Sequence, residues 1–112
     1  MIISHSPNIP ADVLGLILAY KNGTSYTISG TTYDFTSQGA KPFIMYLHGH
    51  EHTDTIDTTD GINNIGVIGG FVSADMTETE DEIRFSIFSI DTANRKIYET
   101  RIGSGNSREF TY

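Results

Sequence analysis

PFIMYLHGHEH, at residues 42–52, sets the expected architecture of this chain. Residues 42–47 are apolar apart from the hydroxyl of Tyr46, as in a strand that is buried on both faces. The next five residues place a histidine at every second position, and Gly49 lets the backbone bend where the strand ends. We therefore expect a cluster of imidazoles at the edge of a sheet.

The composition predicts that most of the chain is sheet. It has 15 Ile and 14 Thr, but only 4 Leu and 5 Ala. β-Branched residues lose rotamer freedom in helices and pack well on a pleated surface. The alternation over Ile83–Ile90 predicts a further strand, and Lys96–Ile102 predicts its hairpin partner. The expected fold class is α+β, mostly β.

One helix is expected near residues 10–22. Pro10 suits the first turn of a helix, and Gly23 can adopt the left-handed conformation that ends one. The apolar positions between them have the helical i, i+3, i+4 spacing, namely Leu14, Ile17 and Leu18.

The remaining segments are expected to lie around this core. Residues 24–36 predict a peripheral hairpin that turns at Ser29-Gly30. Residues 53–61 predict a polar loop, and Ile62–Phe71 predicts a buried strand. Residues 75–82 hold five carboxylates and predict an exposed acidic turn.

Length and charge restrict the function classes. The 112 residues suit a single domain, and the net charge of −7 argues against binding to a nucleic-acid backbone. Without cysteine the chain has no disulfide or thiolate metal site. No apolar run approaches the about 20 residues of a membrane helix, and no secretory signal is recognisable, so we expect a cytoplasmic protein.

All four histidines belong to two predicted strand ends. His48, His50 and His52 share one parity, so an extended backbone would place them on one face. His5 follows the apolar run Met1–Ser4, and open sheets carry ligands at the carboxyl ends of their strands. Imidazole is the commonest metal ligand near neutral pH, so a metal site is one interpretation. The alternative is a group of surface histidines without a ligand.

Other polar residues near these positions have two readings each. Asp54 and Asp75 are candidates for orienting an imidazole from behind, or for plain surface positions. Glu51 lies between two candidate ligands and is expected to face solvent. Arg108 has the guanidinium that grips phosphate in a bidentate manner, its alternative being a surface arginine.

Two motifs carry a resemblance to a family. His5-Ser6-Pro7 after one strand and Gly49–His52 after another resemble the last two metal-binding blocks of the calcineurin-like metallophosphoesterases, a His often followed by x-Pro and then GHxH. The resemblance implies the C-terminal half of a β-sandwich with a mixed sheet. It implies hydrolysis of phosphate monoesters or diesters at a dinuclear site of Mn, Fe or Zn.

The resemblance also assigns roles to the histidines. It implies that His5 and His50 bind one metal and that His52 binds the other. His48, like Asp54 and Asp75, is a candidate for a residue that contacts these ligands and orients them without binding the metal itself.

The same resemblance predicts that the catalytic set is incomplete. The family's DxH, GDxxD and GNH blocks do not occur in residues 1–112, so the chain resembles a fragment or half-domain of a larger phosphoesterase. We expect one weakly held ion at most, and the assignment as an enzyme stays open. The alternative is a non-catalytic metal-binding or self-associating module. A half-sandwich exposes an edge that a homo-oligomer or the missing N-terminal half would cover.

Overall fold

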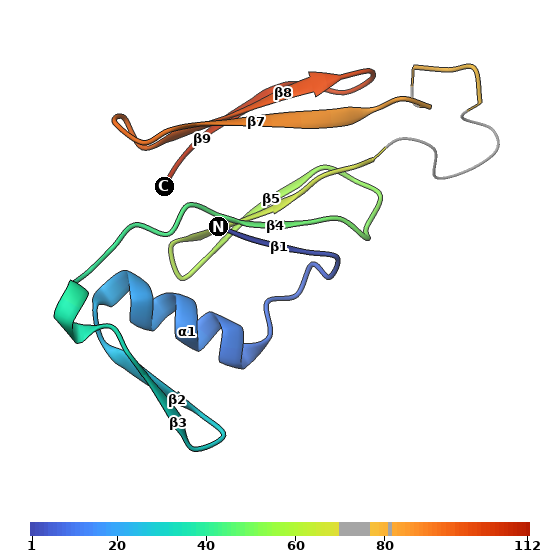
Figure 1. Ribbon diagram of the computed structural model, residues 1–112. Coiled ribbons are helices and arrows are strands. Elements are labelled where there is room, and N and C mark those ends of the chain that lie inside the picture. The colour runs from blue at the N-terminus through green and yellow to red at the C-terminus, as the bar shows by residue number, and fades with distance from the viewer. Residues whose placement is uncertain (70–76, 81) are drawn as a thin grey trace.

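The computed structural model describes residues 1–69, 77–80 and 82–112. This part of the chain is mostly β, with one α-helix and three sheets, so the α+β class is confirmed. The helix, a four-stranded sheet and a three-stranded sheet form successive layers (Figure 1). Within the described residues, no helix has both the length and the apolar character that crossing a membrane requires.

The first sheet is mixed. Its strand order is β1-β4-β6-β5, in which β1, β4 and β6 run parallel and β5 is antiparallel to β6. Both β1 and β5 are therefore edge strands. The bounds are β1 (Ile2–Ser4), β4 (Tyr46–His48), β5 (Thr55–Thr59) and β6 (Ile62–Gly66).

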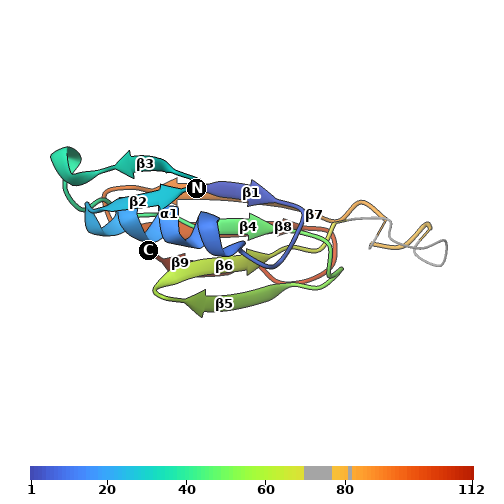
Figure 2. The same cartoon turned by 90° about the horizontal axis from the view of Figure 1, so that it is seen from below.

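The second sheet is antiparallel, with the order β7-β8-β9. Its inner face packs on the first sheet around three fully buried side chains, Met45, Ile65 and Ile97. Figure 2 shows β1 and β7 on one flank of this sandwich and β5 and β9 on the other. The bounds are β7 (Phe85–Asp91), β8 (Lys96–Ile102) and β9 (Arg108–Thr111).

The helix α1 (Ala11–Asn22) covers the other face of the first sheet, which confirms the expected helix. Its side chain Ile17 is buried against Tyr46 and Ile62. Pro10 stands at its N-cap, and Gly23 ends it in the left-handed conformation at φ 63°.

The predicted peripheral hairpin is also present. It comprises β2 (Ser25–Ile28) and β3 (Thr31–Asp34), a two-stranded sheet of its own. A short 3₁₀ turn, η1 (Thr36–Gln38), follows it. The hairpin joins the rest of the molecule mainly along α1, where the ring of Tyr26 occupies the space that a side chain at Gly15 would need.

The prediction of a polar loop at residues 53–61 is wrong, because β5 forms there. Asp60 and Gly61 both have positive φ, 52° and 70°, as in the two-residue turns that connect antiparallel strands. The Asp-Gly pair and the β-branched run Thr58-Thr59 before it are signals for a hairpin that polarity alone conceals.

Two other strands differ in length from expectation. The strand expected over residues 42–47 begins only at Tyr46, because β1 is three residues long and pairs no further back than that position. The strand expected over Ile62–Phe71 ends at Gly66 in the described residues. Residues 70–76 and 81 lie outside the described part, and with them part of the expected acidic turn.

Candidate functional site

The site lies where β1 and β4 leave the first sheet. Parallel pairing sets Ser4 opposite His48, so the residues that follow emerge at the same edge. There the Nε2 atom of His5 lies 2.9 Å from the Nδ1 atom of His50. The two rings are nearly perpendicular, at 82°, with centroids 4.8 Å apart. The structure thus brings together two residues that are 45 positions apart in sequence.

The segment of residues 49–54, here called the histidine loop, is not extended. His50 has a φ of 72°, and the N–H of Glu51 donates to the carbonyl of Gly49 at 2.9 Å, as in a γ-turn centred on His50. His52 is also left-handed, at φ 52°. Because the strand ends at His48, the shared parity of the histidines does not place them on one face.

His48 lies inside the protein rather than with the other two imidazoles. Its side chain belongs to the end of β4, the residue is 3% exposed, and its Nδ1 atom donates to the carbonyl of Gly49 at 3.0 Å. Gly66 on the neighbouring strand gives the ring room, since a Cβ there would lie 2.9 Å from the ring's Cε1 atom. His48 therefore packs beneath the histidine loop.

His52 is exposed and does not line the groove that holds His5 and His50. Within the ranges 1–69, 77–80 and 82–112, no group of three or more His, Asp or Glu side chains converges closely enough to hold a metal ion. The site consequently offers two imidazoles, not three.

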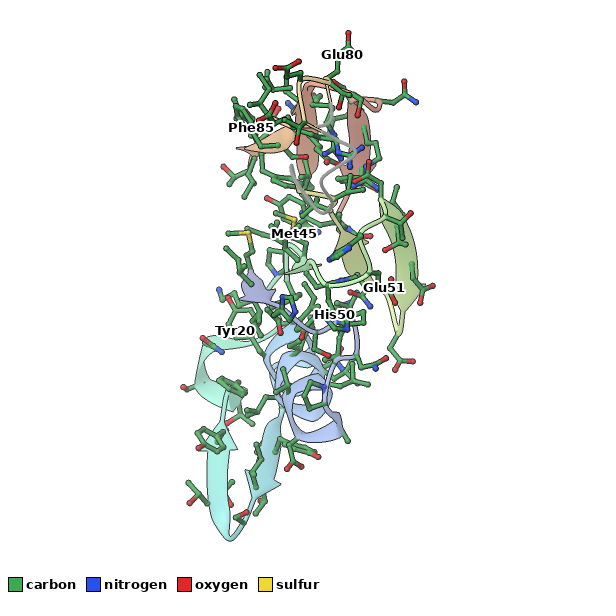
Figure 3. All side chains as sticks on the ribbon, turned by 90° about the vertical axis from the view of Figure 1, so that its right-hand side faces the viewer. Tyr20, Met45, His50, Glu51, Glu80 and Phe85 are labelled. Atoms are coloured by element: carbon green, nitrogen blue, oxygen red, sulfur yellow. The ribbon has the colours of Figure 1, made fainter. Side chains whose placement is uncertain are left out.

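A shallow groove of about 350 Å³ surrounds the histidine pair. Glu51 was expected to face solvent, and it is exposed, but it also lines this groove because the chain turns at His50. Figure 3 shows His50 and Glu51 together in the histidine loop. The lining residues are His5, Ser6, Pro7, Asn8, His50 and Glu51.

Side chains of the first sheet form hydrogen bonds to the segment after His5, which lines one side of the groove. The hydroxyl of Tyr46 donates to the carbonyl of Ser6 at 3.2 Å. The amide nitrogen of Asn64 donates to the carbonyl of Pro7 at 3.1 Å. These two hydrogen bonds come from adjacent parallel strands and fix the turn that follows His5.

Asp54 and Arg108 have other contacts than the sequence predicts. Asp54 contacts arginines: it forms an ion pair with Arg101, and its Oδ1 atom lies 3.8 Å from an Nη of Arg108. Arg108 is mostly buried and donates to Glu99, so it is not a surface arginine. The sequence signal for this arrangement was the alternation on β8, where Glu99 and Arg101 lie at every second position after Ile97 and so face inward with it. Asp75 lies outside the described residues.

Comparisons with protein-family models, with curated proteins and with solved structures give no match. The features that bear on function are the histidine pair, the groove around it and the two sequence motifs that supply it.

Proposed function

We propose that this chain is the metal-binding C-terminal part of a calcineurin-like metallophosphoesterase. The observation that carries the proposal is the 2.9 Å separation of His5 Nε2 and His50 Nδ1 at the ends of two parallel strands. The whole enzyme would hydrolyse phosphate monoesters or diesters at two ions of Mn, Fe or Zn. This chain would supply the last of the ligands.

The geometry of the pair supports an ion held by two imidazoles. With metal–nitrogen bonds of about 2.0–2.1 Å and tetrahedral angles, two ligand nitrogens stand about 3.3 Å apart. The observed 2.9 Å is only a few tenths of an ångström shorter, so small ring movements would admit the ion. His52 would need a change of the histidine loop to contribute.

The chain's own residues would bind and orient. His5 and His50 would hold the ion, and Tyr46 and Asn64 would keep the His5 turn in place through their hydrogen bonds. The carboxylate of Glu51 lies beside the groove, where it can accept a proton from a bound water. An ion bound there would lower the pKa of its water and polarise a phosphoryl oxygen.

The direct test is metal binding by untagged protein. Calorimetry with Mn²⁺ and with Zn²⁺ should give one ion per chain, and His50→Ala should abolish that binding. His52→Ala is the matched control, because it removes an imidazole from the same loop but not from the groove, and should bind like the wild type. Unchanged metal content in His50→Ala would overturn the site.

Activity is tested separately from binding. We expect little or no hydrolysis of an aryl phosphate or a bis-aryl phosphate by this chain with Mn²⁺, because among the described residues no carboxylate joins the two imidazoles in a metal-binding group. Addition of a polypeptide that carries DxH, GDxxD and GNH should raise the rate. No hydrolysis with that addition would count against the phosphoesterase proposal and leave the metal result standing.

A second function, a self-associating module without catalysis, is favoured by the flank that β1 and β7 form. Ile3 is 69% exposed there although it shares a face with Leu47, whose side chain packs in the core between the sheets. Apolar edges of this kind pair with other chains. Size-exclusion chromatography with light scattering should give a dimer or larger species, and a monomer at high concentration would exclude this function.

A further inference from the structure

The histidine loop has a backbone that few residues other than glycine adopt. His50 and His52 both have positive φ, 72° and 52°, and although histidine is among the residues enriched there, a γ-turn centred on a residue with positive φ is rare and strained. Such residues persist where the surrounding structure dictates their conformation. The loop contributes a single local hydrogen bond from Glu51, so its shape needs support from outside.

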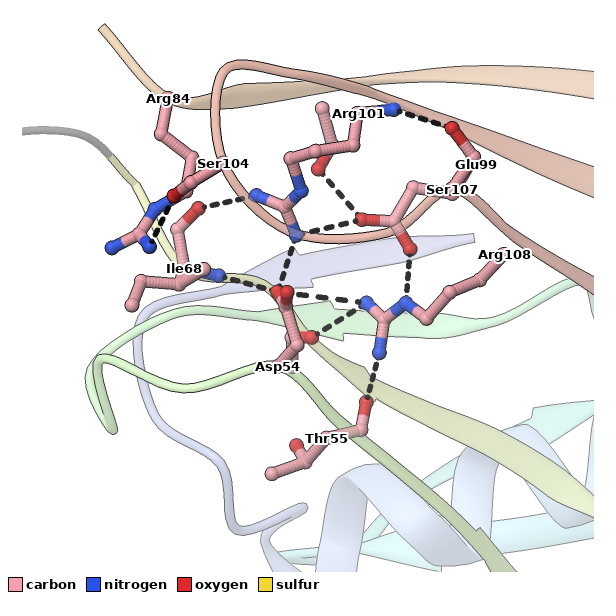
Figure 4. Close-up of polar contacts among 11 residues, drawn as sticks. Asp54, Thr55, Ile68, Arg84, Glu99, Arg101, Ser104, Ser107 and Arg108 are labelled. Atoms are coloured by element: carbon pink, nitrogen blue, oxygen red, sulfur yellow. Dashed lines mark hydrogen bonds and ion pairs between the residues drawn. The ribbon is translucent and has the colours of Figure 1, made fainter. Parts of the chain in front are cut away.

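The support begins at Asp54, the last residue of the loop. Its Oδ1 atom accepts the N–H of Ile68 at 3.0 Å and pairs with an Nη of Arg101 (Figure 4). The other Nη of Arg101 donates to the carbonyl of Ile68 at 2.9 Å. Arg101 belongs to β8, so the second sheet holds the end of the loop against the segment that follows β6.

A second arginine forms hydrogen bonds to two neighbouring strands of the first sheet, β5 and β6, close to Asp54. Arg108 on β9 donates to the carbonyl of Thr55, the first residue of β5, at 3.1 Å. It also donates to the carbonyl of Gly66, the last residue of β6, at 3.0 Å. The start of β5 is thereby fixed immediately after Asp54.

Glu99 joins the two arginines. Its carboxylate is fully buried and accepts from Arg101 at 3.2 Å, from Arg108 at 2.5 Å and from the hydroxyl of Ser86 at 2.6 Å. Two carboxylates and two guanidiniums balance in charge, and we call this set the brace: Asp54, Glu99, Arg101 and Arg108. Buried ion networks cost desolvation, so they are better suited to fixing geometry than to adding stability.

We infer that the brace positions the histidine loop, so that the second sheet sets His50 against His5. Asp54 and Arg101 are positioning residues that act through the loop. This inference rests on the proposed function only for its metal readout. The rival explanation is that the brace holds the two sheets together and leaves the loop to itself.

Two conservative variants separate these explanations. Asp54→Asn keeps an oxygen for the N–H of Ile68 and removes the charge that pairs with Arg101. Arg101→Lys keeps the charge and removes the forked donors. The matched control is Glu109→Gln, which breaks the exposed Lys96–Glu109 ion pair on the same sheet.

Three readouts are needed on the full chain. Nuclear Overhauser cross-peaks between the rings of His5 and His50 report the pair in metal-free protein, calorimetry with Zn²⁺ reports affinity, and the thermal midpoint reports stability. We expect Asp54→Asn and Arg101→Lys to lose the cross-peaks and to bind Zn²⁺ about 10- to 100-fold more weakly. Glu109→Gln should match the wild type in its cross-peaks and in its affinity for Zn²⁺.

Two outcomes would contradict positioning of the histidine loop by the brace. Cross-peaks and affinity retained with a lowered midpoint, or both variants unfolded beside a folded control, would overturn positioning in favour of sheet docking. Should Arg101→Lys alone unfold, Asp54→Asn carries the test. Wild-type protein that binds no Zn²⁺ would refute the proposed metal site, while the cross-peaks still decide whether the brace sets the pair.

Discussion

The two flanks of the sandwich differ in their charged residues. On the flank of β5 and β9, Arg108 joins the sheets by donating to backbone carbonyls of the first sheet and to Glu99 of the second. On the flank of β1 and β7, large apolar side chains are open to solvent, among them Ile3 and Ile87, at 69% and 50% exposure. Neither of those strands has a Lys, an Arg or a Glu.

The difference indicates that charged residues protect one flank against pairing with another chain, whereas the other flank lacks most of this protection. Charged residues at an edge discourage pairing with another chain, and β1 and β7 carry a single one, Asp91 at the end of β7, so most of that edge is free to pair. The charged flank would set the histidine loop, and the apolar flank would receive the partner that completes the site.

Removal of Glu99 tests the charged flank with the largest expected effect. Glu99→Ala leaves Arg101 and Arg108 without the buried carboxylate that they share. Loss of one partner from such a network costs about 3–5 kcal/mol of unfolding free energy. Urea unfolding of the variant measures it, and Glu109→Ala is the control, with an expected loss of about 1 kcal/mol or less. A loss below about 1 kcal/mol for Glu99→Ala would mean that the charged flank does not hold the sheets.

A lysine on each flank tests the apolar flank. Ile87→Lys should weaken self-association about tenfold or more, since an interface there would otherwise bury an apolar side chain. Ile56→Lys on β5 is the matched control, because Ile56 is 52% exposed and Ile87 is 50% exposed. Light scattering over a concentration series gives the dissociation constant. Equal effects of the two lysines would erase the distinction between the flanks.

The turn between β5 and β6 should show a smaller effect. Gly61→Ala places a side chain at φ 70° and about 3.1 Å from the Nζ atom of Lys21, which donates to the carbonyl of Gly61. We expect a loss of about 1–2 kcal/mol, from the left-handed backbone. Gly49→Ala, where the added carbon has free space, is the comparison in thermal unfolding. A neutral Gly61→Ala would show that the charged flank tolerates a different turn.

The smallest effect is expected from pH at the turn that joins β7 to β8. Hydrogen bonds from the side chain and backbone of Asn94 hold the pKa of Asp91 below its usual value of about 3.9. The ionised carboxylate therefore stabilises the fold above that value, and this contribution is lost as the pH falls through the lowered pKa.

The check on Asp91 is a difference between two proteins. The thermal midpoint of the wild type should fall more steeply than that of Asp91→Ala as the pH drops from about 5 to about 2. Carbon-detected titration of the Asp91 carboxyl gives its pKa directly. A pKa at or above the usual value would remove the effect.

Local patterns in the sequence predicted most of the fold. The helix from Pro10 to Gly23 and the peripheral hairpin were predicted because capping residues, turn residues and apolar spacing all act over a few positions. The strand β5 was missed because Thr and Asp made it look like a loop, although Asp60-Gly61 was a hairpin signal.

The candidate site was harder to predict because it is assembled over long distances. Two strand ends with histidines did indicate that His5 and His50 belong together. The parity rule failed beyond His48, because it assumes an extended chain. Arg101 and Arg108 come from the second sheet, and no local pattern links them to Asp54. Which strands stack face to face decides such contacts.

The hairpin of β2 and β3 stands apart from both flanks and from the histidine pair (Figure 1). Its tip, Ser29-Gly30, already has the positive φ values of a tight turn, and Figure 1 shows the hairpin on the far side of α1 from both larger sheets. A peptide tag, a fluorophore or a surface linker inserted at this tip would leave the groove and both edges unobstructed. The hairpin is thus a natural handle for immobilising the protein in binding assays.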